Sequence, residues 1–127
     1  MKHYRIEMEI FEGKAGERKK EDDEIVLPDF SKEGICVWMY RGDGQQSYQV
    51  GQRFRWPEDN GKMCQWLLGS MDGFVKGLRF GAALPWTYKG TPYEKVIDPD
   101  GITTEFVRCP DPASCVVVKL IRTVIDD

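Results

Sequence analysis

The chain is short, moderately hydrophobic and weakly acidic, and these properties exclude several classes of protein. Its 127 residues are 41% hydrophobic and 31% charged, which predicts a single domain over residues 1–127 with a modest core. A net charge of −3 argues against nucleic-acid binding, because a phosphate-binding surface needs clustered lysine and arginine. No apolar run is long enough to cross a bilayer, and residues 1–10 lack a signal-peptide core, so we expect a soluble, cytoplasmic protein without a membrane partner.

Short strands joined by polar turns are expected in the first part of the chain. Residues 4–10 alternate apolar and polar side chains, which is the pattern of a half-buried strand. Residues 13–24, GKAGERKKEDDE, carry mixed charge and predict a solvated loop or hairpin tip. Further strands are expected at 24–27, 35–40 and 52–56, with a turn at 41–47.

A central amphipathic helix is the clearest element of the sequence. Its apolar residues recur at steps of three and four, which predicts one buried face. These residues are Met63, Trp66, Leu67, Met71, Phe74, Val75 and Leu78. Asp59 or Asn60 is expected to cap the first turn and Gly81 to end the helix, with Arg79 complementing the negative end of the helix dipole.

Three glycines, Gly69, Gly73 and Gly77, form a strip beside this apolar face. Each costs roughly 1 kcal/mol relative to alanine in a helix interior, so we expect a neighbour that approaches closely enough to offset the cost. The sheet, a second helix or a second copy of the chain would serve. The last alternative makes the protein a homodimer.

The four cysteines have no short paired spacing, so the sequence predicts no metal site and identifies no cofactor. Cys64 lies in the expected first helical turn, where unpaired backbone amides and the helix dipole favour a thiolate. It also borders the apolar face, where burial would make it inert. Cys109 and Cys115 flank a turn between two expected strands, and a disulfide across this hairpin is an alternative if its geometry allows one.

The last third of the chain predicts an aromatic turn and a terminal hairpin. Trp86 follows Leu84 and Pro85 in a rigid turn, where an aromatic ring either closes the core or walls a ligand pocket. Residues 104–109 and 116–125 have the composition of paired strands. We therefore expect an α+β fold, with a mostly antiparallel sheet packed against one main helix.

Several motifs together resemble a family of small prokaryotic proteins of unknown function that is frequent in anaerobes. The motifs are VGQRF at 50–54, the cysteine of KMCQW at 62–66, LRFG at 78–81, LPW at 84–86, CPDP at 109–112 and VVVKLIR at 116–122. The resemblance covers residues 50–122 and keeps the order and approximate spacing of these elements. It implies functional importance for the matching positions Cys64, Arg79, Trp86, Cys109 and Asp111, without implying a reaction.

The chain contains none of the common catalytic signatures. His3 is its only histidine and lies near the terminus, which disfavours Ser-His-Asp and Cys-His chemistry. No HExxH, Walker A or dinucleotide fingerprint is present. Asp111 lies in a proline-containing turn, where aspartate usually binds nearby backbone, so a role in substrate binding stands beside a role in the turn.

Three functional hypotheses follow from these residues. In the first, Cys64 and Cys109 form a catalytic, thiol-lined site for a small organic anion, with Arg79, Trp86 and Asp111 binding the substrate. In the second, the protein is a noncatalytic module that binds a metabolite or a partner through its aromatic loop and the Gly69/Gly73/Gly77 strip. In the third, it is a small subunit of a complex whose larger partner supplies the chemistry.

Overall fold

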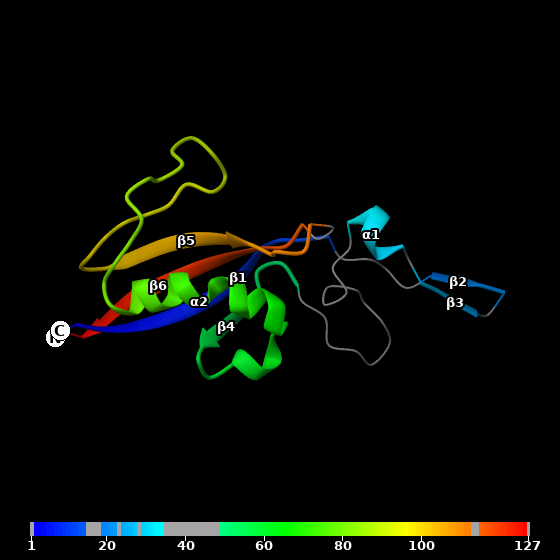
Figure 1. The fold of residues 1–127 in the computed structure, drawn as a ribbon, viewed down its shortest axis with the longest axis horizontal. Helices are drawn as coiled ribbons and strands as arrows, with labels where there is room; N and C mark the ends of the chain where they lie inside the picture. The colour runs from blue at the N-terminus through cyan, green and yellow to red at the C-terminus, as the bar shows by residue number, and fades with distance from the viewer. Residues whose placement is uncertain are drawn as a thin grey trace.

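The computed structural model describes residues 2–14, 19–22, 24–27, 29–34, 49–112 and 115–126. Four antiparallel strands form its main sheet in the order β4-β1-β6-β5. The strands are β1 (His3–Glu12), β4 (Arg53–Trp56), β5 (Ile102–Arg108) and β6 (Val117–Asp126). One long helix, α2 (Gln65–Arg79), lies across one face of this sheet (Figure 1). The expected α+β fold, the first strand, the strand before Pro57 and the terminal hairpin are therefore confirmed.

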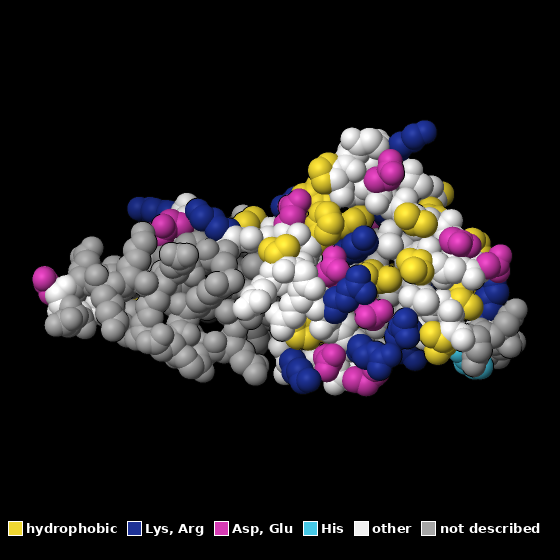
Figure 2. All heavy atoms as spheres, turned by 180° about the vertical axis from the view of Figure 1, so that it is seen from behind, with side chains coloured by type: hydrophobic (Ala, Val, Ile, Leu, Met, Phe, Trp, Pro, Cys, Tyr) yellow, Lys and Arg dark blue, Asp and Glu magenta, His cyan; other side chains and the backbone are white. Residues whose placement is uncertain are grey.

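The core lies between α2 and the facing side of the sheet. Strand register places Phe54, Met8, Leu120 and Glu105 in one row across the four strands. The first three are buried apolar side chains. Because side chains alternate along a strand, the other face is rich in charge, and Figure 2 shows basic and acidic side chains interspersed there. Arg53, for example, donates to Glu9 over 3.0 Å on that face.

The start of α2 differs from the prediction, because Cys64 and not Asp59 or Asn60 is its N-cap residue. A short 3-10 helix, η2 (Asn60–Lys62), precedes it and uses these two positions. The Asp59 carboxylate instead accepts a hydrogen bond from the backbone N–H of Arg55 over 2.8 Å. That bond, together with Lys62, lowers the pKa of Asp59 below its usual 3.8. Asp59 thus closes the turn after β4.

The buried face of α2 also differs in part from the prediction. Leu67, Met71, Val75 and Leu78 are buried as expected, and Leu68 joins them. Trp66 and Phe74 are 58% and 37% exposed, so they lie outside the core face. The seven apolar positions expected on one face span about 180° of arc at 100° per residue, which is wider than one core-facing stripe. Gly81 ends the helix in the expected left-handed conformation, with φ of +86°.

The remaining described elements lie between β1 and β4 along the chain. β2 (Lys19–Glu21) and β3 (Glu24–Val26) form an antiparallel pair, which confirms the hairpin and the strand expected near residue 24. A short helix, α1 (Phe30–Glu33), was not predicted; Asp29 caps it, and Gly34 ends it with a φ of 68°. The strand expected at 35–40, the turn at 41–47 and Cys36 lie outside the described residues. Within the described ranges, no helix is both long and apolar enough to span a membrane.

The cysteines of the terminal hairpin are thiols and form no disulfide. The backbone N–H of Cys109 pairs with the carbonyl of Val116, and the Cys109 side chain packs against the core. The Cys115 thiol instead donates to the carbonyl of Gly34 over 3.4 Å. The disulfide alternative is therefore wrong, because the two sulfurs have different surroundings.

Candidate ligand-binding groove

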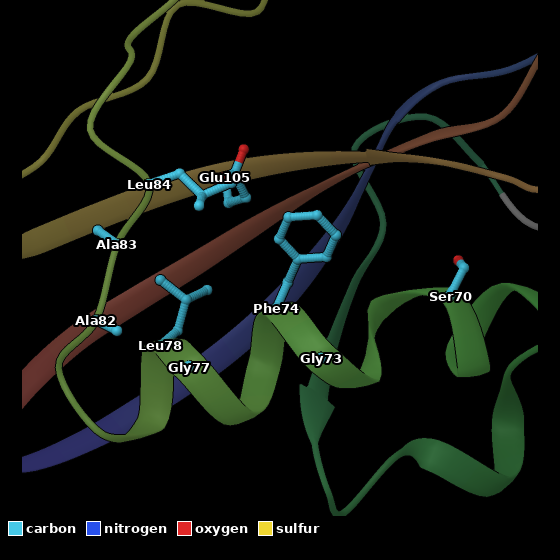
Figure 3. A pocket seen from close by; sticks show the side chains of 9 residues that line it. All are labelled: Ser70, Gly73, Phe74, Gly77, Leu78, Ala82, Ala83, Leu84 and Glu105. Atoms are coloured by element: carbon cyan, nitrogen blue, oxygen red, sulfur yellow. The ribbon is translucent and has the colours of Figure 1, made fainter.

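An open groove runs between α2 and strand β5, with a volume of about 410 Å³. Figure 3 shows its three walls: one flank of α2, the chain that follows the helix, and the edge strand β5. The lining residues are Ser70, Gly73, Phe74, Gly77, Leu78, Ala82, Ala83, Leu84 and Glu105. All but Ser70 and Glu105 are glycines or have apolar side chains, so the surface is largely hydrocarbon.

The groove exists because one helix cannot cover a four-stranded sheet. Strands lie about 4.8 Å apart, whereas a helix with its side chains is about 10 Å wide and covers about two of them. Helix α2 lies mainly over β1, so the edge at β5 is left to the segment after the helix. That segment has no helix or strand between Phe80 and Gly101, and it only partly fills the space.

The glycine strip contributes to the groove instead of packing tightly within the chain. No described atom lies within 4 Å of where a Cβ would stand at Gly69 or Gly73, and at Gly77 the nearest such atom is the Cβ of Ala82 at 3.9 Å. Close packing of the described chain against this strip, one of the expected alternatives, is therefore wrong. Gly73 and Gly77 leave the helix wall of the groove without side chains.

Glu105 places a carboxylate in an otherwise apolar wall. Its row across the sheet holds Leu120, Met8 and Phe54, so the same position on a neighbouring strand is occupied by hydrocarbon. Its Oε2 accepts a hydrogen bond from Lys95 Nζ over 2.9 Å. The two side chains are only 8% and 1% exposed. A buried carboxylate is stable in such a wall because the lysine pairs with it.

Two aromatic rings border this ion pair. Lys95 Nζ lies 5.4 Å from the ring centroid of Trp86 and 5.6 Å from that of Tyr88, within the range of cation–π attraction. Both rings are about half exposed. The backbone of Val96 pairs with Thr104 of β5 over 2.8 Å, which fixes this segment at the sheet edge. Trp86, expected as a ligand wall, thus borders the Lys95–Glu105 pair and does not line the groove itself.

Arg122 holds the end of α2 against the sheet beneath the groove. Its Nη1 donates to the carbonyls of Leu78 and Ala82 over 3.0 and 3.1 Å, and its Nη2 donates to the Thr103 hydroxyl over 2.9 Å. The guanidinium also stacks 4.8 Å from the ring centroid of Tyr4. Burial lowers the pKa of Arg122 below its ordinary value, an effect that Tyr4 opposes. The positions of Leu78 and Ala82 in the groove therefore depend on a buried cation.

The residues expected to form a site lie elsewhere. Cys64 and Cys109 are half-buried and pack against the core cluster, and neither lines the groove. Arg79 is exposed on the last turn of α2, and Asp111 is half-buried in the turn of the terminal hairpin. Within the described ranges, no group of three or more histidine, cysteine, aspartate or glutamate side chains is placed to hold a metal ion. The thiol-centred site remains a hypothesis that the groove does not involve.

Sequence reasoning missed Glu105, Lys95 and Ser70. A signal for Glu105 was available, because it shares the parity of Thr103 and Val107 along β5 and thus places a charge on the buried face. Lys95 carried no comparable signal, since it lies in a segment without periodicity. Comparisons of the chain with models of protein families, with curated proteins and with solved structures found no match. The resemblance to a prokaryotic family therefore stays a prediction.

Proposed function

We propose that the protein is a noncatalytic binding module that takes a small, largely apolar molecule in the groove between α2 and β5. The observation that carries this proposal is an apolar groove of about 410 Å³ with a single carboxylate, Glu105, in its wall. Small-molecule sites typically measure about 300–1,000 Å³ and combine apolar walls with a few polar groups. The groove meets both criteria.

The charge of the groove indicates which ligands it prefers. Glu105 is its only charged lining residue, and the Glu105 oxygens accept hydrogen bonds from Lys95 and from the backbone N–H of Phe106. A carboxylate oxygen has capacity for a second donor. A ligand with a hydroxyl or amine group therefore fits, whereas the organic anion expected from the sequence has no donor for this oxygen.

Matched probes test this preference. We suggest titrating phenylbutanol, phenylbutylamine and phenylbutyrate into the 15N-labelled protein and recording amide shifts by NMR. The alcohol and the amine should shift the amides of Gly73, Gly77 and Ala83, and the carboxylate should bind at least about tenfold more weakly. Equal binding of all three, or shifts confined to other residues, would contradict the proposal.

Two variants locate the site. Ala83→Trp fills the groove and should abolish the probe-induced shifts. Arg79→Ala is the matched control, because Arg79 is exposed and lies outside the groove lining. If Arg79→Ala weakens binding and Ala83→Trp does not, the result would support an organic-anion site at Arg79 and contradict binding in the groove.

A further inference from the structure

Helix α2 carries a second nonpolar stripe that points away from its own core. At about 100° per residue, Trp66, Gly69, Gly73, Gly77 and Phe80 fall within about 80° of arc, centred about 170° from the buried residues. Trp66 is 58% exposed and Phe80, just past the last turn, is 88% exposed. An outward helix face is normally polar, and here it has three glycines between two aromatic side chains.

The described chain leaves most of this stripe uncovered, and only Gly77 at one end lies beside another segment, at Ala82. In Figure 1, α2 lies in front of the sheet with no labelled element over its outer side. The space around Gly69 and Gly73 is open in the described structure, as shown above. The glycines therefore lower helix stability without a gain in packing inside the described chain.

The stripe reads the same in both directions from Gly73. Four residues away on either side is a glycine, Gly69 or Gly77, and seven residues away is an exposed aromatic residue, Trp66 or Phe80. In a twofold interface each residue contacts its symmetry equivalent or a residue that contacts it in return, so this pattern would pair glycine with glycine and aromatic with aromatic. A second copy of α2, antiparallel and crossing at Gly73, would place Trp66 against Phe80 of that copy.

The charges on one flank of the stripe match the same arrangement. Asp72 and Lys76 lie on this flank and form an ion pair over 2.8 Å within the helix. A twofold axis perpendicular to both helices brings equal flanks together. At 1.5 Å rise per residue, Asp72 then lies about 3 Å along the axis from Lys76 of the second copy and about 3 Å from Asp72 of that copy. Two pairs of opposite charge thus lie at the ends of the flank, against one pair of like charge at its centre.

We propose that α2 is a self-association surface, and that its occupant is the α2 helix of a second copy of this chain, antiparallel and centred on Gly73. Glycines at the crossing point let two helix backbones approach closely, and the flanking aromatic pairs then bury the area that is exposed in one copy. The charged flank sets the direction of the second helix. Gly73 and Gly77 also line the groove, so the second helix would cover part of the groove's helix wall, and a groove ligand would compete with it.

The first test replaces Gly73, the residue at which the two helices would cross. The chain should be a dimer by light scattering at micromolar concentrations and above, and Gly73→Glu should raise the dissociation constant at least about tenfold, because it places two carboxylates at the axis. Gln49→Glu adds the same charge at an exposed position outside α2 and should leave the mass unchanged. Far-UV circular dichroism verifies folding. A parent chain that is monomeric at all concentrations, or an unaffected dimer in Gly73→Glu, overturns the proposal.

The second test exchanges charges and does not depend on Gly73. Asp72→Lys makes the flank wholly basic, and Lys76→Asp makes it wholly acidic, so each variant alone should shift towards monomer. An equimolar mixture of the two should form mixed dimers, detected by native mass spectrometry. Failure of the mixture to associate, with both variants folded, would show that the flanks do not meet.

Discussion

Lys95 Nζ donates a hydrogen bond of 2.9 Å to Glu105 Oε2, and both side chains are almost completely buried. This pair connects the irregular segment after α2 to the edge strand β5. Removal of one partner from a buried ion pair leaves an uncompensated charge, which typically costs about 3–5 kcal/mol. The pair therefore determines whether the segment stays in place beside the groove.

The first prediction concerns this pair. Lys95→Met or Glu105→Leu alone should lower the free energy of unfolding by about 3 kcal/mol, because each leaves the other group unpaired in a dry environment. The double variant Lys95→Met with Glu105→Leu should recover most of that loss. Chemical denaturation of the four proteins measures the coupling. Additive losses in the double variant would mean that the two groups act independently.

The second prediction concerns Arg122, which donates to two carbonyls near the end of α2 and to a hydroxyl of β5. Arg122→Met should lower the free energy of unfolding by roughly 3 kcal/mol, because the carbonyls of Leu78 and Ala82 lose their buried donor. The exposed Arg79 on the last turn of α2 is the matched position, and Arg79→Met should change stability by less than about 0.5 kcal/mol. Equal losses of stability at both positions would show that the buried hydrogen bonds of Arg122 do not contribute to the free energy of unfolding.

Periodicity predicted the fold because strands and the helix each bury one face. The alternation along β1 and the three- and four-residue steps along α2 are direct consequences of that burial. The same signal misplaced Trp66 and Phe74, because it records that a side chain is apolar without recording what covers it. Trp66 lies at the edge of the predicted arc, whereas Phe74 lies near its middle and is exposed because it lines the open groove.

The groove could not be predicted in the same way. Its carboxylate depends on Lys95, which reaches β5 from an irregular segment that local sequence patterns do not place. The helix start was missed for a related reason: Asp59 has the side chain of a cap residue, but its carboxylate closes the turn after β4. In both cases a partner that the local pattern does not indicate, Lys95 for Glu105 and the Arg55 amide for Asp59, determines what the carboxylate does.

The third prediction uses the pH dependence of Tyr93. Its hydroxyl donates to both carboxylate oxygens of Glu12 over 2.7 Å, and this bond raises the pKa of Tyr93 above its usual 10.0. Since the neutral phenol is the form that donates, the stability from this bond is present below pH 10 and is lost as the pH rises through the higher folded-state pKa. Titration of tyrosinate absorbance should show a late step that disappears in Tyr93→Phe and moves to lower pH in Glu12→Gln. A late step that persists in Tyr93→Phe belongs to another tyrosine.

The fourth prediction separates the groove from the thiol hypothesis. Cys64 and Cys109 are half-buried against the core, so iodoacetamide should modify both slowly in the folded protein and rapidly in denaturant. Peptide mapping by mass spectrometry assigns the rate to each cysteine. Rapid modification of Cys64 near pH 7, with loss of probe binding in Cys64→Ser, would instead favour the thiol-centred site.

The fifth prediction contrasts a glycine within α2 with the glycine that follows the C-cap of this helix. At Gly69 a Cβ would meet no described atom within 4 Å, so Gly69→Ala should stabilise the monomer by about 1 kcal/mol through helix propensity. At Gly81 φ is +86°, and a Cβ would stand 3.1 Å from the Tyr4 hydroxyl, so Gly81→Ala should destabilise it by at least about 1 kcal/mol. Thermal unfolding at concentrations low enough to exclude association measures both changes. Because the two substitutions add the same methyl group, opposite signs can only come from backbone conformation and local space, and equal signs would mean that this end of α2 is placed differently in solution.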